Sequence, residues 1–323
     1  MDIRTKYRWH LVGIGALLHF LVDGLCLCCL YLIVFPFSFS YLTGIFVVYN
    51  VLAFLTQPLT GLLADRMRDR HWMLLAAVVL LLAAVMTVTF GFSFAAYLAP
   101  VLLGIGNSLF HVWGGKQVVL KAGNDTRALG LFVSTGAFGL AVSMVFFSLS
   151  LLYFFLLALC LLAVAYLKLE QNDVRVGNAL QEKPWSNRIE KSRRLLLLVV
   201  VAFVMFRSFV GESFTSAIVK DNMVVLLIGL TAMLGKMAGG WLARRMGIML
   251  TLAAVLVVVS GCLLCRSSER YVMLTGLFAV NCTMPVTLYW ANGLLKGREG
   301  LAFGLLAAAL IPGYLLSTFP LWP

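Results

Sequence analysis

Five ionisable side chains interrupt long apolar runs of the sequence, and their types suggest proton and ion chemistry. His19 and Asp23 are four residues apart, so on a helix they share one face. His111, Arg207 and Glu212 lie in other apolar runs. Histidine titrates near neutral pH, so we predict that the two histidines and the two carboxylates carry protons. Arg207 keeps its charge in any environment, and we predict that it binds substrate.

Asp23 and Arg207 are also predicted to pair with each other across a central cavity. A buried carboxylate without a partner would be neutralised, whereas a guanidinium cannot be, and a salt bridge lets both stay charged. Two interpretations are open: the pair breaks when a proton or a ligand binds, or it is static and fixes the helix register. His19 is likewise either a proton site or only a hydrogen-bonding neighbour of Asp23.

Polar and aromatic side chains from other runs are expected to line the same cavity. The candidates for substrate binding besides Arg207 are Tyr49, Asn107, Phe110, Trp113, Asn281 and Tyr289. Lys116 and Lys236 lie near the ends of their runs, so their long stems are expected to reach the membrane surface. Cys262 and Cys265 have a spacing seen in metal sites, but no histidine or carboxylate is nearby in the sequence. We predict no metal and no other cofactor.

The runs that carry these residues are expected to be membrane helices. Hydrophobic residues make up 62% of the 323 residues and charged residues only 12%, a composition that excludes a soluble domain. Each run has about the 20 residues needed to cross ~30 Å of hydrocarbon. The sequence therefore predicts an all-α membrane protein with about eleven transmembrane helices. They are expected near residues 10–35, 40–63, 72–91, 94–120, 127–147, 149–168, 195–218, 222–243, 246–265, 271–294 and 300–319.

The net charge of +12 is explained by topology. If the N-terminus is cytoplasmic, nearly all basic residues between helices face the cytoplasm, and only Lys220, Arg266 and Arg270 lie outside. This asymmetry predicts a cytoplasmic N-terminus and an external C-terminus in a multi-pass cell (inner) membrane protein. It also excludes nucleic acid as a partner, leaving protons, membrane lipid and a small-molecule substrate.

An internal repeat predicts two related lobes. Pro58–Met67 and Met237–Met246 each end an apolar run with small residues followed by arginine, and Asn107–His111 corresponds to Asn281–Pro285. The predicted divisions are a six-helix bundle over 1–168, a basic cytoplasmic linker over 169–194 and a five-helix bundle over 195–323. The last helix of the second bundle is expected to be missing. We expect a monomer.

The segment Gly61–Arg70 resembles the inner-loop signature of the major facilitator superfamily. Four further segments resemble the fosmidomycin-resistance branch of its drug exporters: His19–Asp23, Gln57–Pro58, Ser108–His111 and Arg127–Gly136. The resemblance implies two pseudo-symmetric bundles with alternating access, and export of a small drug-like or amphipathic molecule by proton antiport. It further implies a latch on the inner side, with gating residues Gly61, Asp65, Arg66 and Arg70.

The sequence departs from this family pattern at specific positions. Val112 and Trp113 follow His111 where the family usually has proline and often an acidic residue, and Arg244 stands where the first repeat has Asp65. Two alternatives therefore stay open. One is a facilitator or importer of a small anionic metabolite, and the other is a degenerate carrier that acts as a sensor or scaffold. An enzyme is not predicted, because no nucleophile–base set is present.

Overall fold

The computed structural model describes residues 8–35, 39–67, 71–92, 94–176, 191–218, 221–265 and 269–317. These residues are almost entirely helical and contain no β-strand. Ten helical spans within these ranges are long and apolar enough to cross a membrane, and the 17-residue α10 is apolar but shorter. The predicted all-α membrane fold is confirmed, with a number of spans close to the eleven predicted.

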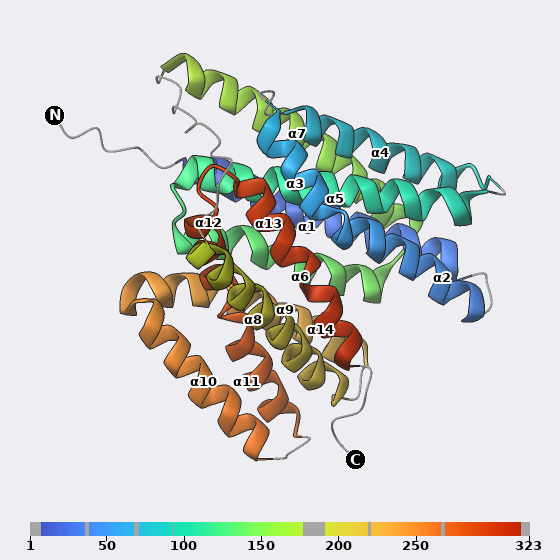
Figure 1. The fold of residues 1–323 in the computed structure, drawn as a ribbon. Helices are drawn as coiled ribbons and strands as arrows, with labels where there is room; N and C mark the ends of the chain where they lie inside the picture. Colours follow the sequence, from blue (N-terminus) through green and yellow to red (C-terminus); the bar gives the residue numbers. More distant parts are fainter. Residues whose placement is uncertain are drawn as a thin grey trace.

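Apart from α7 and α8, which are separated by residues 177–190 outside the described ranges, the helices follow one another closely along the chain (Figure 1). The first half of the chain contains α1 (Trp9–Val34), α2 (Phe39–Asn50), the π-helix η1 (Val51–Leu55), α3 (Gln57–Arg66), α4 (Trp72–Thr89), α5 (Ala95–Ala122), α6 (Thr126–Phe146) and α7 (Leu149–Val176). The second half contains α8 (Lys191–Ser216), α9 (Asn222–Met246), α10 (Ile248–Leu264), α11 (Arg270–Asn281), α12 (Met284–Leu294), α13 (Glu299–Ala308) and α14 (Leu310–Ser317).

Three membrane spans are interrupted, each close to a proline. α2, η1 and α3 form one span that contains Pro58, α11 and α12 form one that contains Pro285, and α13 and α14 form one that contains Pro312. Proline has no N–H to donate to the carbonyl four residues earlier, so the regular helix is broken in the preceding turn. Broken helices of this kind free backbone groups inside a membrane protein, and transporters place their binding sites beside them.

α1 lies at the centre of the first half and packs against α5, α6 and α7. Gly136 and Gly139 let α6 approach α1 closely, since a Cβ on Gly139 would lie 2.3 Å from the carbonyl oxygen of Phe20. α7 continues to Val176, and its candidate membrane span, Leu149–Gln171, lies close to the span predicted near 149–168. Glu170, in the last part of this helix, is buried in a salt bridge with Lys121 of α5. Residues 177–190 of the predicted linker lie outside the described ranges.

The two halves of the chain meet along α6 and α9 and along α3 and α13, which lie side by side in Figure 1. Both contacts are formed by backbone on backbone. A Cβ on Gly61 would lie 2.4 Å from the carbonyl oxygen of Gly300, and one on Gly240 would lie 2.4 Å from that of Thr126. We refer to the end of the bundle that contains these contacts as the Asp65 end.

Candidate functional site

Two clusters of polar side chains lie inside the bundle, and the first joins α1 to α5. His19 and Asp23 come from α1 and His111 from α5, and all three are buried. The two Nε2 atoms of the histidines lie 2.9 Å apart. Asp23 Oδ2 lies 3.2 Å from Nε2 of His19, and Oδ1 lies 3.4 Å from Nε2 of His111. We call these three residues the proton centre.

Backbone carbonyls fix the tautomers of both rings. Nδ1 of His19 lies 2.7 Å from the carbonyl oxygen of Phe132, and Nδ1 of His111 lies 2.9 Å from that of Asn107. A carbonyl can only accept, so each Nδ1 carries a hydrogen. In two neutral rings, both Nε2 atoms would then be acceptors, facing each other beside a carboxylate. One additional proton between them turns this into a hydrogen bond.

Two neighbouring residues support the proton centre: Asn107 donates a hydrogen bond to the ionised carboxylate, and Gly136 leaves room for the side chains. Asn107 donates from Nδ2 to Asp23 Oδ1 at 3.1 Å. Gly136 on α6 leaves the space that the centre occupies, because a Cβ there would lie 2.1 Å from Asp23 Oδ2 and 2.5 Å from His19 Nε2. The centre therefore depends on the absence of a side chain at Gly136, and the spacing of the polar residues alone does not reveal this.

A metal ion is the other cation that such a centre could take. Its three donor atoms lie within 4.8 Å of one another. Nitrogen ligands on tetrahedral zinc are roughly 3.3 Å apart, given bonds of about 2.0–2.1 Å. The observed 2.9 Å between the two Nε2 atoms is shorter and matches a hydrogen bond. The geometry therefore favours a shared proton.

The second cluster surrounds a cavity of about 210 Å³ in the second half of the chain. Its lining consists of Arg207, Ser208, Gly211, Glu212, Thr215, Lys236, Leu277, Val280, Asn281, Met284 and Leu310. Arg207 is 7% exposed, its Nη1 contacts Met284 Sδ at 3.4 Å, and its Nε is buried without a hydrogen-bond partner. Asn281 lies at the break between α11 and α12, so an interrupted helix contributes to the cavity wall.

The predicted salt bridge between Asp23 and Arg207 is not present in this structure. Asp23 pairs with the two histidines instead, and Arg207 makes no ion pair with a described carboxylate. The predicted single cavity is likewise divided, because His19, Asp23 and His111 do not line the 210 Å³ cavity. The sequence places these residues at similar depths but cannot show that Asp23 turns toward its own lobe.

Two lysines occupy positions that differ from the prediction. Lys236 lines the cavity rather than reaching the surface, and it is close enough to Arg207 and Asp23 for their charges to interact. Lys116 donates from Nζ to the carbonyl of Ala64 at 2.8 Å. Lys116 lies six residues before the end of α5 and Lys236 ten residues before the end of α9, so Lys236 lies deeper in its helix than the sequence predicts. Both side chains turn inward, and no local sequence signal shows this.

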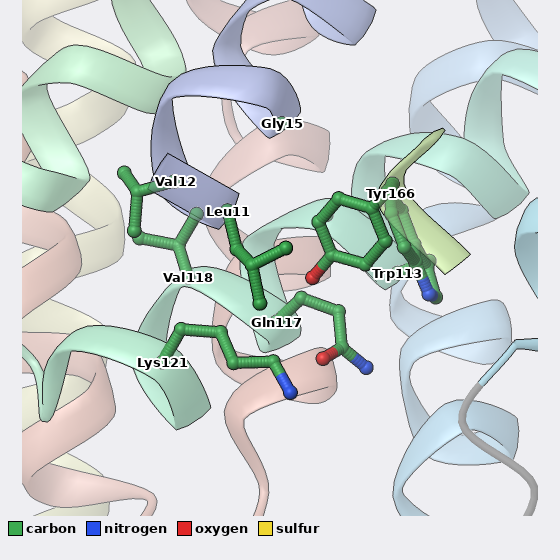
Figure 2. A pocket seen from close by; sticks show the side chains of 9 residues that line it. Leu11, Val12, Gly15, Trp113, Gln117, Val118, Lys121 and Tyr166 are labelled. Atoms are coloured by element: carbon green, nitrogen blue, oxygen red, sulfur yellow. The ribbon is translucent and has the colours of Figure 1, made fainter. Parts of the chain in front are cut away.

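The predicted aromatic substrate residues lie elsewhere in the structure. Phe110 and Trp113 are buried in the first half, with Phe110 packed against the ring of His19. Figure 2 shows Trp113 with Tyr166 and Gln117 beside a void of about 10 Å³, enough for about one water molecule. Tyr49 is buried near Asp23, and the Tyr289 carbonyl accepts a hydrogen bond from Asn124. None of these four aromatic residues is among those that line the 210 Å³ cavity.

Asp65 joins α3 to the start of α13. Its Oδ1 accepts the N–H of Gly300 at 2.9 Å and its Oδ2 accepts that of Leu301 at 2.8 Å. Lys116 lies 3.7 Å from the same carboxylate. A carboxylate at a helix N-terminus satisfies free N–H groups and the helix dipole. Gly61 and Asp65 thus lie together at this junction, Arg66 is exposed, and Arg70 lies outside the described residues.

The corresponding junction between α6 and α9 is built with different charges. Thr126 donates from Oγ1 to the carbonyl of Gly240 at 2.9 Å. Asp125 caps α6 and binds Arg127, whose guanidinium lies over the rings of Trp9 and Trp241. The charge of Arg244 also acts on Asp125. An acidic residue is therefore present at the second junction, on the helix opposite to the one that the repeat predicts.

Comparison with known proteins settles the family. A family profile described as Major Facilitator Superfamily matches residues 12–318. The chain belongs to the major facilitator superfamily. This facilitator is therefore a multi-pass membrane protein and a secondary transporter, as predicted. Superfamily members bind small-molecule substrates and are usually monomeric.

Solved structures share the fold of this facilitator at low sequence identity. The human organic anion transporter MFSD10 (TETRAN) is 19% identical with a TM-score of 0.70, over 98% of this chain and 93% of that one. A variant of the E. coli fucose:proton symporter, FucP, is 14% identical with a TM-score of 0.65, over 97% and 91%. A bacterial homologue of the iron transporter ferroportin, in an outward-facing state, is 15% identical with a TM-score of 0.64, over 95% and 90%. A search of curated protein sequences finds no match.

Proposed function

We propose that this facilitator couples the movement of a small organic solute to that of a proton, and that His19, Asp23 and His111 carry the proton. The observation that carries the proposal is the 2.9 Å contact between two Nε2 atoms whose rings both hold their hydrogen on Nδ1. Such a contact needs one proton between the rings. The protonated centre then contains one positive and one negative charge.

Loss of this proton changes the forces between helices. Two Nε2 lone pairs would face each other beside an unpaired carboxylate, so α1 and α5 would be pushed apart at this point. His19 is also bound to the carbonyl of Phe132 on α6, and α6 packs along α9 of the second half. A movement of His19 is therefore passed through α6 to the junction between the halves. Alternating access needs such a link between a binding site and the junction.

The charged groups around the proton centre are few. α1 supplies His19 and Asp23, and α5 supplies His111. α6 contributes only a carbonyl and Gly136. Lys236 of α9 is a cation of the second half on which the charge of Asp23 acts. Tyr49 and Cys26 are further titratable side chains that interact with Asp23. We expect the pH dependence of transport to come chiefly from the two histidines, because histidine is the side chain that titrates near neutral pH.

We propose that the two halves form the two lobes predicted from the repeat, and that the Asp65 end faces the cytoplasm. The excess of lysine and arginine on that side supports this orientation in the cell membrane, with the N-terminus inside and the C-terminus outside. Asp65 and Gly61 then hold the cytoplasmic side closed. Export by antiport and membership in the fosmidomycin-resistance branch stay predictions based on resemblance. A cavity of 210 Å³ is smaller than the ~300–1,000 Å³ of drug-sized sites, which favours a smaller solute.

Reconstituted vesicles test the coupling. Purified protein is placed in liposomes that contain a pH-sensitive dye, and a panel of small organic solutes is applied under an imposed pH difference. We expect uphill transport of a solute with proton flux in the native protein. Asp23→Asn should lose uphill transport but keep counterflow exchange, which needs no net proton movement. Normal uphill transport by Asp23→Asn would show that the coupling site lies elsewhere, with Glu212 the next candidate.

A further inference from the structure

We propose that the 210 Å³ cavity binds a small organic anion, whose acid group is held between Arg207 and Lys236, and that Lys236 links this anion to the proton centre. The inference rests on the proposed function, because it names the substrate class of the same carrier. It also assigns a role to Lys236, for which the sequence predicts only contact with the surface.

Arg207 is positioned to bind an oxyanion. It is buried, no described carboxylate lies within salt-bridge distance, and its contact with Met284 Sδ is a weak one. Its Nε has no partner. A buried guanidinium without an acceptor is costly, and carboxylate or phosphonate oxygens match its donor geometry with two parallel hydrogen bonds. The N–H of Arg207 Nε, which has no acceptor, therefore marks where we expect the acid group of the ligand to bind.

The charges of the cavity lining require one negative charge. Arg207 and Lys236 are cations, and Glu212 is the carboxylate in the lining. This leaves one positive charge in excess, which a monoanion neutralises. Arg207 also acts electrostatically on Lys236, so the two cations repel until an anion lies between them.

The rest of the lining describes the body of the ligand. Leu277, Val280, Met284 and Leu310 give an apolar wall, while Ser208, Thr215 and Asn281 add hydrogen-bonding groups. The volume is below that of sites for drug-sized molecules. A small acid with a compact apolar body, such as an aromatic or short branched carboxylate, fits this combination.

Lys236 connects the two clusters through its place in the fold. It lines the cavity together with Arg207, and its helix α9 packs along α6, whose Phe132 carbonyl holds His19 of the proton centre. The charge of Asp23 also acts on Lys236. When the proton centre is protonated, the imidazolium balances Asp23 and leaves Lys236 free for the anion. When the proton leaves, the centre carries a net negative charge and competes with the anion for Lys236. Anion and proton therefore bind together, with reciprocal strengthening. This linkage favours co-transport of anion and proton over the antiport that the family resemblance implies.

Equilibrium binding tests the anion site with a charged and a neutral probe of the same shape. Benzoate and benzamide are titrated against the full-length protein in nanodiscs of a zwitterionic lipid, by calorimetry and by thermal shift at constant pH. We expect benzoate to bind and benzamide to bind at least about tenfold more weakly. Arg207→Gln and Lys236→Gln should each weaken benzoate by about tenfold or more. Arg270→Gln, which removes an exposed cation elsewhere, should leave binding unchanged.

The Asp23→Asn variant tests whether anion binding in the cavity is coupled to the proton centre. It mimics the protonated centre, so it should strengthen benzoate binding and remove its pH dependence. This variant also guards against misfolding, because a gain in affinity cannot come from an unfolded chain. Equal binding of benzamide and benzoate, or unchanged affinity in both cavity variants, would overturn the anion site. Displacement of benzoate by phosphatidylglycerol, with no soluble acid binding more tightly, would assign the cavity to a lipid headgroup instead.

The outcome is independent of the coupling assay, because binding in nanodiscs needs no proton gradient. Loss of benzoate binding with intact proton-linked transport of other solutes would reject only the anion site. Benzoate binding without any proton-linked transport would reject only the proposed coupling.

Discussion

Nε2 of His19 lies 2.9 Å from Nε2 of His111, and each ring holds its other nitrogen against a backbone carbonyl. The two rings therefore present their unprotonated nitrogens to each other when both are neutral. Their contact can form only with a proton that neither ring would hold in its neutral state, and Asp23 supplies the charge that retains it.

The His111→Gln variant should keep the side-chain contact between α1 and α5 but lose the shared proton. In His111→Gln, the amide NH₂ can donate to His19 Nε2 without any added proton, so the helices stay together while proton binding is lost. We expect counterflow exchange to become nearly independent of pH between about 5 and 8, where histidine normally titrates. His10→Gln, at an exposed histidine, is the matched control and should keep the native pH profile.

Asp23 and Arg207 should contribute independently to stability. Direct ion pairs in a buried site cost about 3–5 kcal/mol when one partner is removed, and the cost depends on the other partner. Because the two side chains are not paired in this structure and share only the charge of Lys236, the losses in Asp23→Asn and Arg207→Ala should be additive to within about 1 kcal/mol. Unfolding free energies of the single and double variants in detergent measure this. A coupling above about 1 kcal/mol would mean that they pair in a populated state.

Asp65→Asn should loosen the Asp65 end. The carboxylate accepts two backbone N–H groups of α13, and an amide can accept only through its oxygen while its NH₂ faces the second donor. Charge-assisted hydrogen bonds contribute about 1.5–3 kcal/mol each, so amide hydrogen exchange at the start of α13 should rise by about tenfold or more. Asp221→Asn changes a helix cap on α9 and should leave α13 protected. Unchanged amide hydrogen exchange at the start of α13 in Asp65→Asn would show that Asp65 does not hold α3 and α13 together.

Gly61→Ala should disturb the same junction by volume alone. The added methyl would lie 2.4 Å from the carbonyl oxygen of Gly300, so α3 and α13 must separate. Overpacking of this kind costs about 1–3 kcal/mol. Gly13→Ala offers a matched control, since its Cβ meets nothing within 4 Å and helix propensity makes alanine slightly favourable there. Thermal stability and the protection of α13 from exchange should fall only in the Gly61 variant.

The Asp125 cap should make stability sensitive to acid. Burial raises the pKa of this carboxyl, but hydrogen bonds from Arg127 and nearby positive charge outweigh it and hold the pKa below its ordinary value. A lowered folded-state pKa means that the stabilisation is complete above the ordinary value of about 4 and is lost as pH falls through the folded-state pKa. Asp125→Asn should therefore lower the melting temperature at pH 7 and have little effect once the pH is well below the folded-state pKa.

Helix positions and the class of protein followed from the sequence because they depend on composition and length. Apolar runs long enough to cross a bilayer predicted the spans, and prolines at 58, 285 and 312 account for the interruptions that run length alone does not show. The buried salt bridge between Glu170 of α7 and Lys121 of α5 could not be predicted, because it joins residues far apart in the sequence.

The proton centre was predictable in part. The four-residue spacing of His19 and Asp23 places them on one helix face, but their contact with His111 depends on how α5 and α6 pack around α1. The direction of Lys236 was not predictable, because α9 extends to Met246 and the long lysine stem can turn either toward the surface or toward the cavity. The same packing determines that Asp23 meets histidines rather than Arg207.

The balance of charges in the two clusters has a consequence for the driving force. A proton centre that gains one positive charge and a cavity that gains one negative charge carry no net charge across the bilayer when both are loaded. The membrane voltage contributes ~2.3 kcal/mol per elementary charge per 100 mV, so it would do no work on such a loaded carrier. Transport would then be electrically silent in planar-bilayer or solid-supported membrane recordings, and the difference in pH together with the anion gradient would set its direction.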